Sequence, residues 1–196
     1  MEPLDLIETE NEPAPSDRKL NATVAITVAL LATFMGMCKV KDDNINQSMQ
    51  QAQANRVDHW AFYQARNVRE EVAKATVVQL KLASAGHTGV EQADYQDAIK
   101  QYETLAREQG RKKAESKADA ENDQKVYDAA NFRDDQFDLS DALLAIAISL
   151  LAVTALTQLW ALYFVGLVPT AFGVLMGLSG LAGWPIHPSA LIALLS

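Results

Sequence analysis

Gly86-His87-Thr88-Gly89 is a glycine-flanked tetrapeptide near the middle of a stretch that contains no proline between Pro15 and Pro169. Proline breaks helix interiors, so a stretch of this length can form almost continuous helix. The two glycines favour a turn within it. The sequence therefore predicts an all-α protein with a long antiparallel helical hairpin of the coiled-coil type, in which the chain reverses at residues 85–89.

The two arms on either side of this turn have similar lengths. Residues 39–84 form the first arm and residues 90–138 the second, which gives 46 and 49 residues by subtraction. At a rise of 1.5 Å per residue, the arms would be roughly 69 and 74 Å long. Matched arms allow a chain to leave a membrane and return to it, so we expect an extramembrane hairpin over residues 39–138.

Four residues are expected to form the hairpin turn. Gly86 suits the left-handed conformation that ends a helix, and Gly89 closes the same glycine cluster. Thr88 and Glu91 are three residues apart, which is the spacing of a capping box at the start of the returning helix.

Two segments of the chain lack charged side chains. Lysine, arginine, aspartate and glutamate are absent from residues 20–38 and from residues 142–196. About 20 apolar residues cross the hydrocarbon core of a bilayer, so residues 20–38 predict transmembrane helix 1. Residues 139–184 are about twice the needed length and predict transmembrane helices 2 and 3. The expected break between them is Thr157-Gln158, with Gly166 to Pro169 as an alternative.

The two ends of the chain differ from these helices. Residues 1–19 are acidic and contain three prolines, so we expect an extended N-terminal tail. Residues 185–196 are uncharged and begin at a proline, which predicts a C-terminal tail in the membrane interface. The first apolar segment ends at Met37-Cys38 without a small-x-small cleavage site, so it is expected to stay as an anchor rather than be removed as a signal peptide.

Composition argues against several classes of function. The net charge of −8 and the absence of a basic patch make nucleic acid an unsuitable partner. Cys38 is the only cysteine, which rules out an internal disulfide and a cysteine-rich metal site. His59, His87 and His187 lie far apart in the predicted hairpin, so we expect no metal site within one chain. Without a phosphate-binding loop or converging catalytic groups, we expect no cofactor, no catalytic residue and no enzyme.

Apolar residues recur on the first arm at spacings of three and four. This pattern predicts the seam that faces the second arm, where Ile99 and Tyr102 are expected to meet its upper part. The seam is thin in its lower half, so a second helix pair from another copy would stabilise it and we expect a homo-oligomer. The predicted seam consists of Val57, Trp60, Gln64, Val68, Val72, Ala75, Val78 and Leu82.

Trp60 has two interpretations. In the first it packs inside the protein, with Tyr63 and Gln64 on the same face. In the second the region binds another protein, and Phe62 and Arg66 on another side contact that partner.

A stripe of small residues lies in the predicted third transmembrane helix. Gly173, Gly177 and Gly180 are spaced for close approach of a neighbouring helix in lipid. The neighbour is either a helix of the same chain or one of another copy.

The segment Asp58-His59-Trp60-Ala61-Phe62-Tyr63-Gln64-Ala65-Arg66 resembles the most recognisable stretch of an uncharacterised bacterial membrane family, domain of unknown function 4337. That family has an initial membrane helix, a charged helical hairpin and a terminal helix pair, and most of this chain is similar to it. Leu156-Thr157 followed by Trp160 and Tyr163 resembles the family's junction between its last two helices. The basic junction of the family implies the bacterial inner (cytoplasmic) membrane, with the hairpin outside the cytoplasm; the junction here is Gln158-Leu159.

These observations predict a non-enzymatic, membrane-anchored coiled-coil protein that self-associates. It would act as a scaffold or as an accessory subunit of a membrane complex, with the lipid bilayer and further copies of itself as partners. The alternative is a pore or transport component made by an oligomer of the membrane helices, in which polar groups such as Thr154 and Gln158 line the pore.

Overall fold

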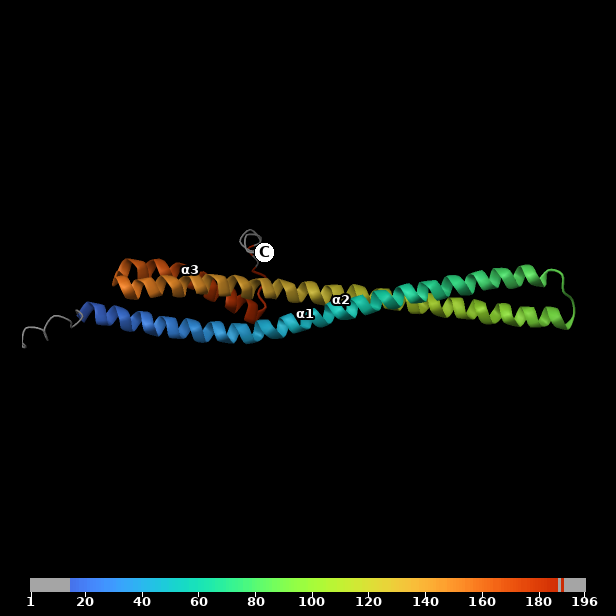
Figure 1. Cartoon of the computed structure of the whole chain (residues 1–196), viewed down its shortest axis with the longest axis horizontal. Coiled ribbons are helices and arrows are strands. Elements are labelled where there is room, and N and C mark those ends of the chain that lie inside the picture. The colour runs from blue at the N-terminus through green and yellow to red at the C-terminus, as the bar shows by residue number, and fades with distance from the viewer. Residues whose placement is uncertain (1–14, 187, 189–196) are drawn as a thin grey trace, which may run out of the picture. The chain divides into compact units, whose positions relative to one another are not determined.

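The computed structural model describes residues 15–186 and residue 188 (Figure 1). Three helices make up nearly all of this part of the chain: α1 over Pro15–Ser84, α2 over Val90–Thr157 and α3 over Trp160–Ala182. No strand occurs among the described residues, so the protein is all-α there.

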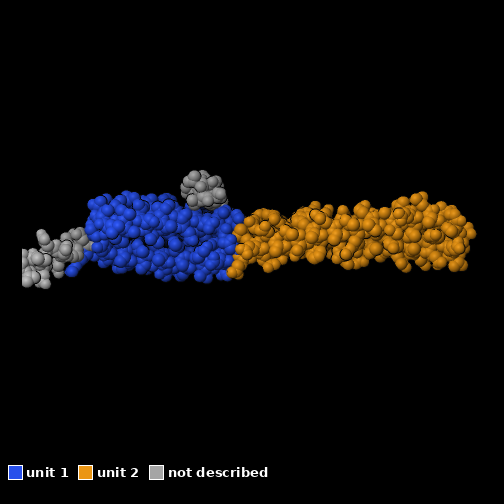
Figure 2. Space-filling view, in the orientation of Figure 1, with its two compact units in different colours: residues 1–46, 131–196 blue, residues 47–130 orange. Residues whose placement is uncertain are grey.

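The chain divides into two compact units (Figure 2). Residues 1–46 and 131–196 form one, which we call the apolar unit, and residues 47–130 form the other, which we call the hairpin unit. Because α1 is 70 residues long and α2 is 68, each contributes to both units. Each helix therefore contains one membrane-length apolar segment and one charged arm.

The start of α1 differs from the expected extended tail. Residues 15–19 are helical, so that prediction is wrong for them, while residues 1–14 lie outside the described part. The reason is that Pro15 occupies the first position of the helix, where a fixed φ and a missing N–H are both tolerated. The interfacial tail predicted for residues 185–196 falls almost wholly outside the described residues, as does His187.

The turn between α1 and α2 occupies residues 85–89. Its left-handed residue is Gly89, with φ of 73°, and Gly86 does not have a positive φ, so the expected role of Gly86 is wrong. Gly89 directly precedes α2, and its carbonyl accepts a hydrogen bond from the Ala93 N–H (3.3 Å). The positive φ is therefore needed where the chain enters α2, not where it leaves α1.

The capping box predicted for this turn is also wrong. Thr88 lies one residue before the capping position, which Gly89 occupies. The Glu91 carboxylate instead approaches His87, with 2.9 Å between Oε2 and Nδ1.

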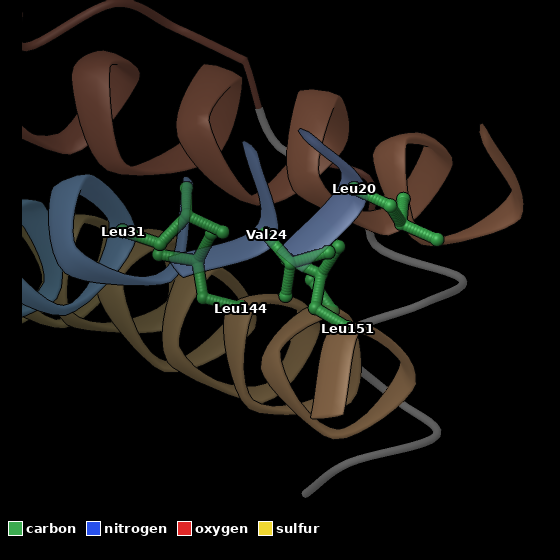
Figure 3. Close-up of a cluster of buried hydrophobic side chains, with 6 residues drawn as sticks. Leu20, Val24, Leu31, Leu144 and Leu151 are labelled. Carbon is green, nitrogen blue, oxygen red and sulfur yellow. The ribbon is translucent and has the colours of Figure 1, made fainter. Parts of the chain in front are cut away.

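The apolar unit has a core made by α1 and α2 (Figure 3). Its residues are spaced by three, four or seven along each helix, so they share one face of α1 and one of α2. All are 5 % exposed or less: Leu20, Val24, Leu31, Leu144, Ala147 and Leu151.

The reversal between α2 and α3 occurs at Gln158 and Leu159, and Pro169 lies inside α3. Gln158 takes the left-handed conformation, with φ of 57°. Its side-chain amide donates to Asn21 Oδ1 (3.0 Å) and to the Ala155 carbonyl (2.5 Å). The alternative break at Gly166 to Pro169 is therefore not used.

All three helices contain a segment long and apolar enough to cross a membrane. This holds for the N-terminal part of α1, the C-terminal part of α2 and the whole of α3, by length and composition. These segments indicate association with a membrane.

Candidate functional site

The surfaces of the hairpin unit are the candidate site, and they begin with the seam between α1 and α2. Most of the α1 residues of this unit that are buried or half-buried follow a repeat of 3.5 residues. Polar and charged side chains occupy the middle of this inner seam. Its α1 residues are Met49, Ala52, Arg56, His59, Tyr63, Arg66, Glu70, Ala73, Val77 and Leu80.

Polar contacts join the two helices in the middle of the inner seam. His59 Nδ1 lies 2.7 Å from Asp123 Oδ2. Arg66 donates a hydrogen bond from Nη1 to Gln109 Oε1 at 3.1 Å. Paired polar groups of this kind fix the register of two helices, because any shift leaves them without partners.

Glu70 is the most buried acid of the inner seam and holds two lysines. Its Oε2 lies 2.6 Å from Lys113 Nζ of α2, and its Oε1 lies 2.7 Å from Lys74 Nζ of α1. The hydrogen bond from Lys113, and next that from Lys74, lowers the pKa of Glu70. Gly110 leaves room for this carboxylate, since a Cβ there would lie 3.4 Å from Glu70 Oε1.

The apolar residues predicted to face α2 lie on the opposite, exposed side of α1. Val57, Val68, Val72, Val78 and Leu82 are 57–73 % exposed, so the prediction of the seam is wrong. Two stripes with helical spacing run along opposite sides of α1, offset from each other by one or two residues in the sequence. The stripe with more charges faces α2, because α2 supplies partners for those charges.

On α2, the two residues expected in the seam differ from each other. Ile99 is buried, whereas Tyr102 is 38 % exposed.

The five predicted residues around Trp60 do not share one face. Trp60 packs edge-on against Tyr63, with ring centroids 5.4 Å apart, and Tyr63 is half-buried. Gln64 is exposed, on the outer side of α1. Phe62 is 55 % exposed, while Arg66 points into the inner seam, so these two do not form a common partner-binding patch.

A groove of about 540 Å³ lies beside Trp60. It combines apolar groups of the outer side of α1 with polar groups of the inner seam. At the groove, Arg56 of α1 donates a hydrogen bond to Gln124 of α2. Its lining residues are Arg56, Val57, Trp60, Ala61, Gln64 and Gln124.

The glycines of α3 pack against other helices of the same chain, in the apolar unit. A Cβ at Gly173 would lie 2.9 Å from Leu144, and one at Gly180 would lie 2.8 Å from Phe137. At Gly177 the neighbours would be Phe34 of α1 and Ser140 of α2, both at 2.8 Å. These glycines let α3 approach α1 and α2 closely.

Two residues of α2 bind the C-terminal end of α3. No pattern in the sequence indicates this contact. The Arg133 guanidinium donates to the Gly180 carbonyl at 2.9 and 3.2 Å. The Gln136 amide donates to Ser179 Oγ (3.1 Å) and to the carbonyls of Trp184 (2.9 Å) and Ile186 (2.6 Å). These donors satisfy carbonyls that a helix end leaves free, and the cation suits the negative end of the helix dipole.

A group of acids lies near the start of the second apolar segment. Asp42 is 2 % exposed, and its Oδ2 accepts a hydrogen bond from Lys39 Nζ (2.7 Å). Burial raises the pKa of Asp134 to about 7, and a hydrogen bond with Asp42 and the charge of Asp138 act in the same direction. No group of three or more His, Cys, Asp or Glu side chains arranged to hold a metal occurs in the described part of the chain.

The polar groups expected to line a pore make contacts within the chain. Thr154 is fully buried and donates to the Leu150 carbonyl at 2.8 Å. Gln158 donates to Asn21, as described above.

Comparisons with known proteins give one match. The family described as a domain of unknown function (DUF4337) matches residues 20–183, from the first buried leucine of α1 to the end of α3. No curated protein and no solved structure matches the chain. Because the match covers well over half of the sequence, the chain belongs to the DUF4337 family.

Proposed function

We propose that the protein is a non-enzymatic, membrane-anchored coiled-coil scaffold that self-associates and serves a membrane complex as an accessory subunit. The observation that carries this proposal is the continuity of α1 and α2. Each is one helix that contains both a membrane-length apolar segment and an arm of the hairpin unit. Such a chain presents a helical surface from a membrane anchor.

The distribution of polar groups in the apolar unit supports insertion in a bilayer. Its polar side chains Gln136, Ser140 and Ser179 are buried inside, where they hydrogen bond to one another or to backbone carbonyls. Large apolar side chains cover its outside, among them Leu30 and Phe172. A surface of this kind suits lipid better than water.

The repeat of the inner seam supports a coiled coil in the hairpin unit. Buried positions on α1 recur every 3.5 residues, which is the period of helices that wind around each other. The contact between Glu70 and Lys113 then acts as a polar layer that fixes the register.

Pairing among the charged groups supports a structural role. In the inner seam, Glu70 is bound by Lys74 and Lys113, and Asp123 by His59. These groups hold the two arms together. A scaffold requires this arrangement, whereas a catalytic site requires groups that converge on a substrate.

The basic α2–α3 junction of the family favours one orientation, although the junction of this chain is Gln158-Leu159 and contains no Lys or Arg. We place the protein in the inner membrane of a bacterium, with the hairpin unit outside the cytoplasm. Single cysteines in a Cys38→Ala background, labelled in intact cells by a membrane-impermeant maleimide, would test this, with Lys112→Cys in the hairpin unit and Asn21→Cys near the junction. The orientation is supported if only the cysteine at position 112 reacts, and it is overturned if only the one at position 21 does.

Purification of the full chain from native membranes in mild detergent tests the function itself. We expect particles that contain more than one copy, whose mass is measured by light scattering or native mass spectrometry, together with any co-purifying membrane protein. A monomer without a partner would overturn the proposal.

A further inference from the structure

The side of α1 that faces away from α2 forms a second apolar seam in the hairpin unit. We call it the outer stripe and define it by Val57, Gln64, Val68, Val72, Val78 and Leu82. Ala61 and Ala75 lie between these residues and are also exposed. The outer stripe contains one polar residue, whereas the inner seam contains several.

A helix with two such seams on nearly opposite sides is typical of a bundle with more than two helices. Within the described part of the chain, α2 covers only the inner seam. Among the described residues, no helix of the same copy packs against the outer stripe.

We propose that the outer stripe binds the outer stripe of a second copy of this chain, α1 against α1, so that two hairpin units form a four-helix bundle. This inference rests on the proposed membrane-anchored self-association and names its surface. The two α1 helices run parallel, because copies anchored in one bilayer through the same segment of α1 extend it in the same direction.

The length and spacing of the outer stripe suit packing against the same stripe of a second copy. From Val57 to Leu82 it extends over about 3.7 heptads, and an apolar pattern sustained over three to four heptads indicates helix pairing. The same surface patch on two copies meets itself when they associate across a two-fold axis, so apolar residues of one stripe can face those of the other.

Gln64 gives the stripe one position that favours a second copy in register. Its amide has both a donor and an acceptor, so it can hydrogen bond to its counterpart when the two lie opposite each other. A single polar residue of this kind in an apolar seam sets the register of parallel helices.

The charged residues beside the stripe do not oppose this contact. Glu71 lies seven residues from both Gln64 and Val78, in the same row of the stripe, and Lys74 Nζ offsets the charge of its carboxylate at 3.0 Å within the same chain. The groove beside Trp60 includes Val57, Ala61 and Gln64 of the outer side, so it offers a hollow for a side chain of the second copy.

Cysteine cross-linking in membranes tests the surface and the direction. In a Cys38→Ala background, Val68→Cys is expected to form a disulfide-linked dimer on mild oxidation. Thr104→Cys is the matched control, because it is an exposed residue of the same unit on α2. We expect little or no dimer from the control.

Two further variants separate parallel from antiparallel packing. In parallel packing, Val57→Cys and Leu82→Cys each cross-link when expressed alone. If the two cross-link only to each other in co-expressed mixtures, the packing is antiparallel and the inference in this form is overturned.

The mass of the oligomer separates failure of this inference from failure of the proposed function. A protein that remains oligomeric while Val68→Cys does not cross-link above the control overturns the inference alone, as does a cross-link to a different protein. A protein that is monomeric without a partner overturns both. As a second measurement, Val68→Glu with Val72→Glu should abolish the dimer while leaving the helical circular dichroism signal unchanged, and Thr104→Glu should do neither.

Discussion

The carboxylate of Glu70 lies against Gly110 in the hairpin unit, and a Cβ added at Gly110 would be 3.4 Å from Glu70 Oε1. The smallest residue of α2 thus faces the most buried acid of the hairpin unit. A Cβ at this distance would just contact the carboxylate, so this contact does not by itself require a glycine inside the 68-residue helix.

Gly110→Ala is expected to raise the stability of the protein. Alanine is favoured over glycine within a helix by about 1 kcal/mol, and the neighbouring atom is the end of a flexible side chain that can move slightly. The midpoint of thermal unfolding, followed by circular dichroism, should rise. In a Glu70→Ala background, Gly110→Ala should raise the unfolding midpoint by more than it does in the native protein. A smaller rise in that background would contradict this account of the contact.

Glu70→Gln is expected to lower thermal stability at neutral pH, because it removes the charge that holds Lys74 and Lys113. The pKa of Glu70 is lowered from 4.5 by these lysines, so its stabilisation is present above pH 4.5 and is lost as the pH falls through the lowered folded value. The difference between the two proteins should therefore be constant from pH 7 to pH 5 and shrink below pH 4.5.

The matched control is Glu121→Gln, whose exposed carboxylate lies 3.7 Å from Lys117. Exposed ion pairs contribute little to stability, so this variant should unfold at nearly the native temperature. Equal losses in both variants would show that the position of Glu70 in the inner seam is unimportant.

Asp134→Asn is expected to raise the unfolding temperature more at pH 8 than at pH 5. Burial and neighbouring acids raise the pKa of Asp134 from 3.8 to about 7, so the folded state holds a proton that the unfolded state releases above pH 3.8. The contribution of Asp134 to the free energy of unfolding is fully present below pH 3.8 and is lost as the pH rises through about 7. Asparagine cannot ionise and avoids this loss.

Asp43→Asn serves as the control, because it removes an exposed carboxylate from the same unit. Its effect on the unfolding temperature should be small at both values of pH. A gain for Asp134→Asn that does not depend on pH would contradict the raised pKa.

Gly177→Ala is expected to destabilise the apolar unit. The added Cβ would lie 2.8 Å from Phe34 and 2.8 Å from Ser140, so α3 would have to move away from two helices. Overpacking of this kind costs about 1–3 kcal/mol. Thermal unfolding in detergent should occur at a lower temperature, while Gly36→Ala, which meets nothing within 4 Å and replaces a glycine inside a helix, should not lower it.

The three apolar segments and the turn were predictable because they depend on local properties. The charge-free segments and the lack of proline between Pro15 and Pro169 indicate long helices whatever the helices pack against. The roles of individual turn residues were less predictable. Gly86 and Gly89 are both suitable for a positive φ, and only the direction in which the chain enters α2 selects Gly89.

The face of α1 that meets α2 was not predictable from apolar spacing. A side chain such as Arg66 is placed inside because Gln109, more than 40 positions away, accepts its hydrogen bond. The binding of the end of α3 by Arg133 and Gln136 likewise depends on backbone carbonyls that no sequence pattern marks.

The sequence by itself thus determined the helices, the segments of membrane length and the place of the hairpin turn, because proline, glycine and charge act on the nearest turn of the chain. Only the tertiary structure decided which of two stripes on opposite sides of α1 is inside. That choice depends on the charges that α2 brings to the contact, and its consequence is that the more apolar stripe remains on the surface.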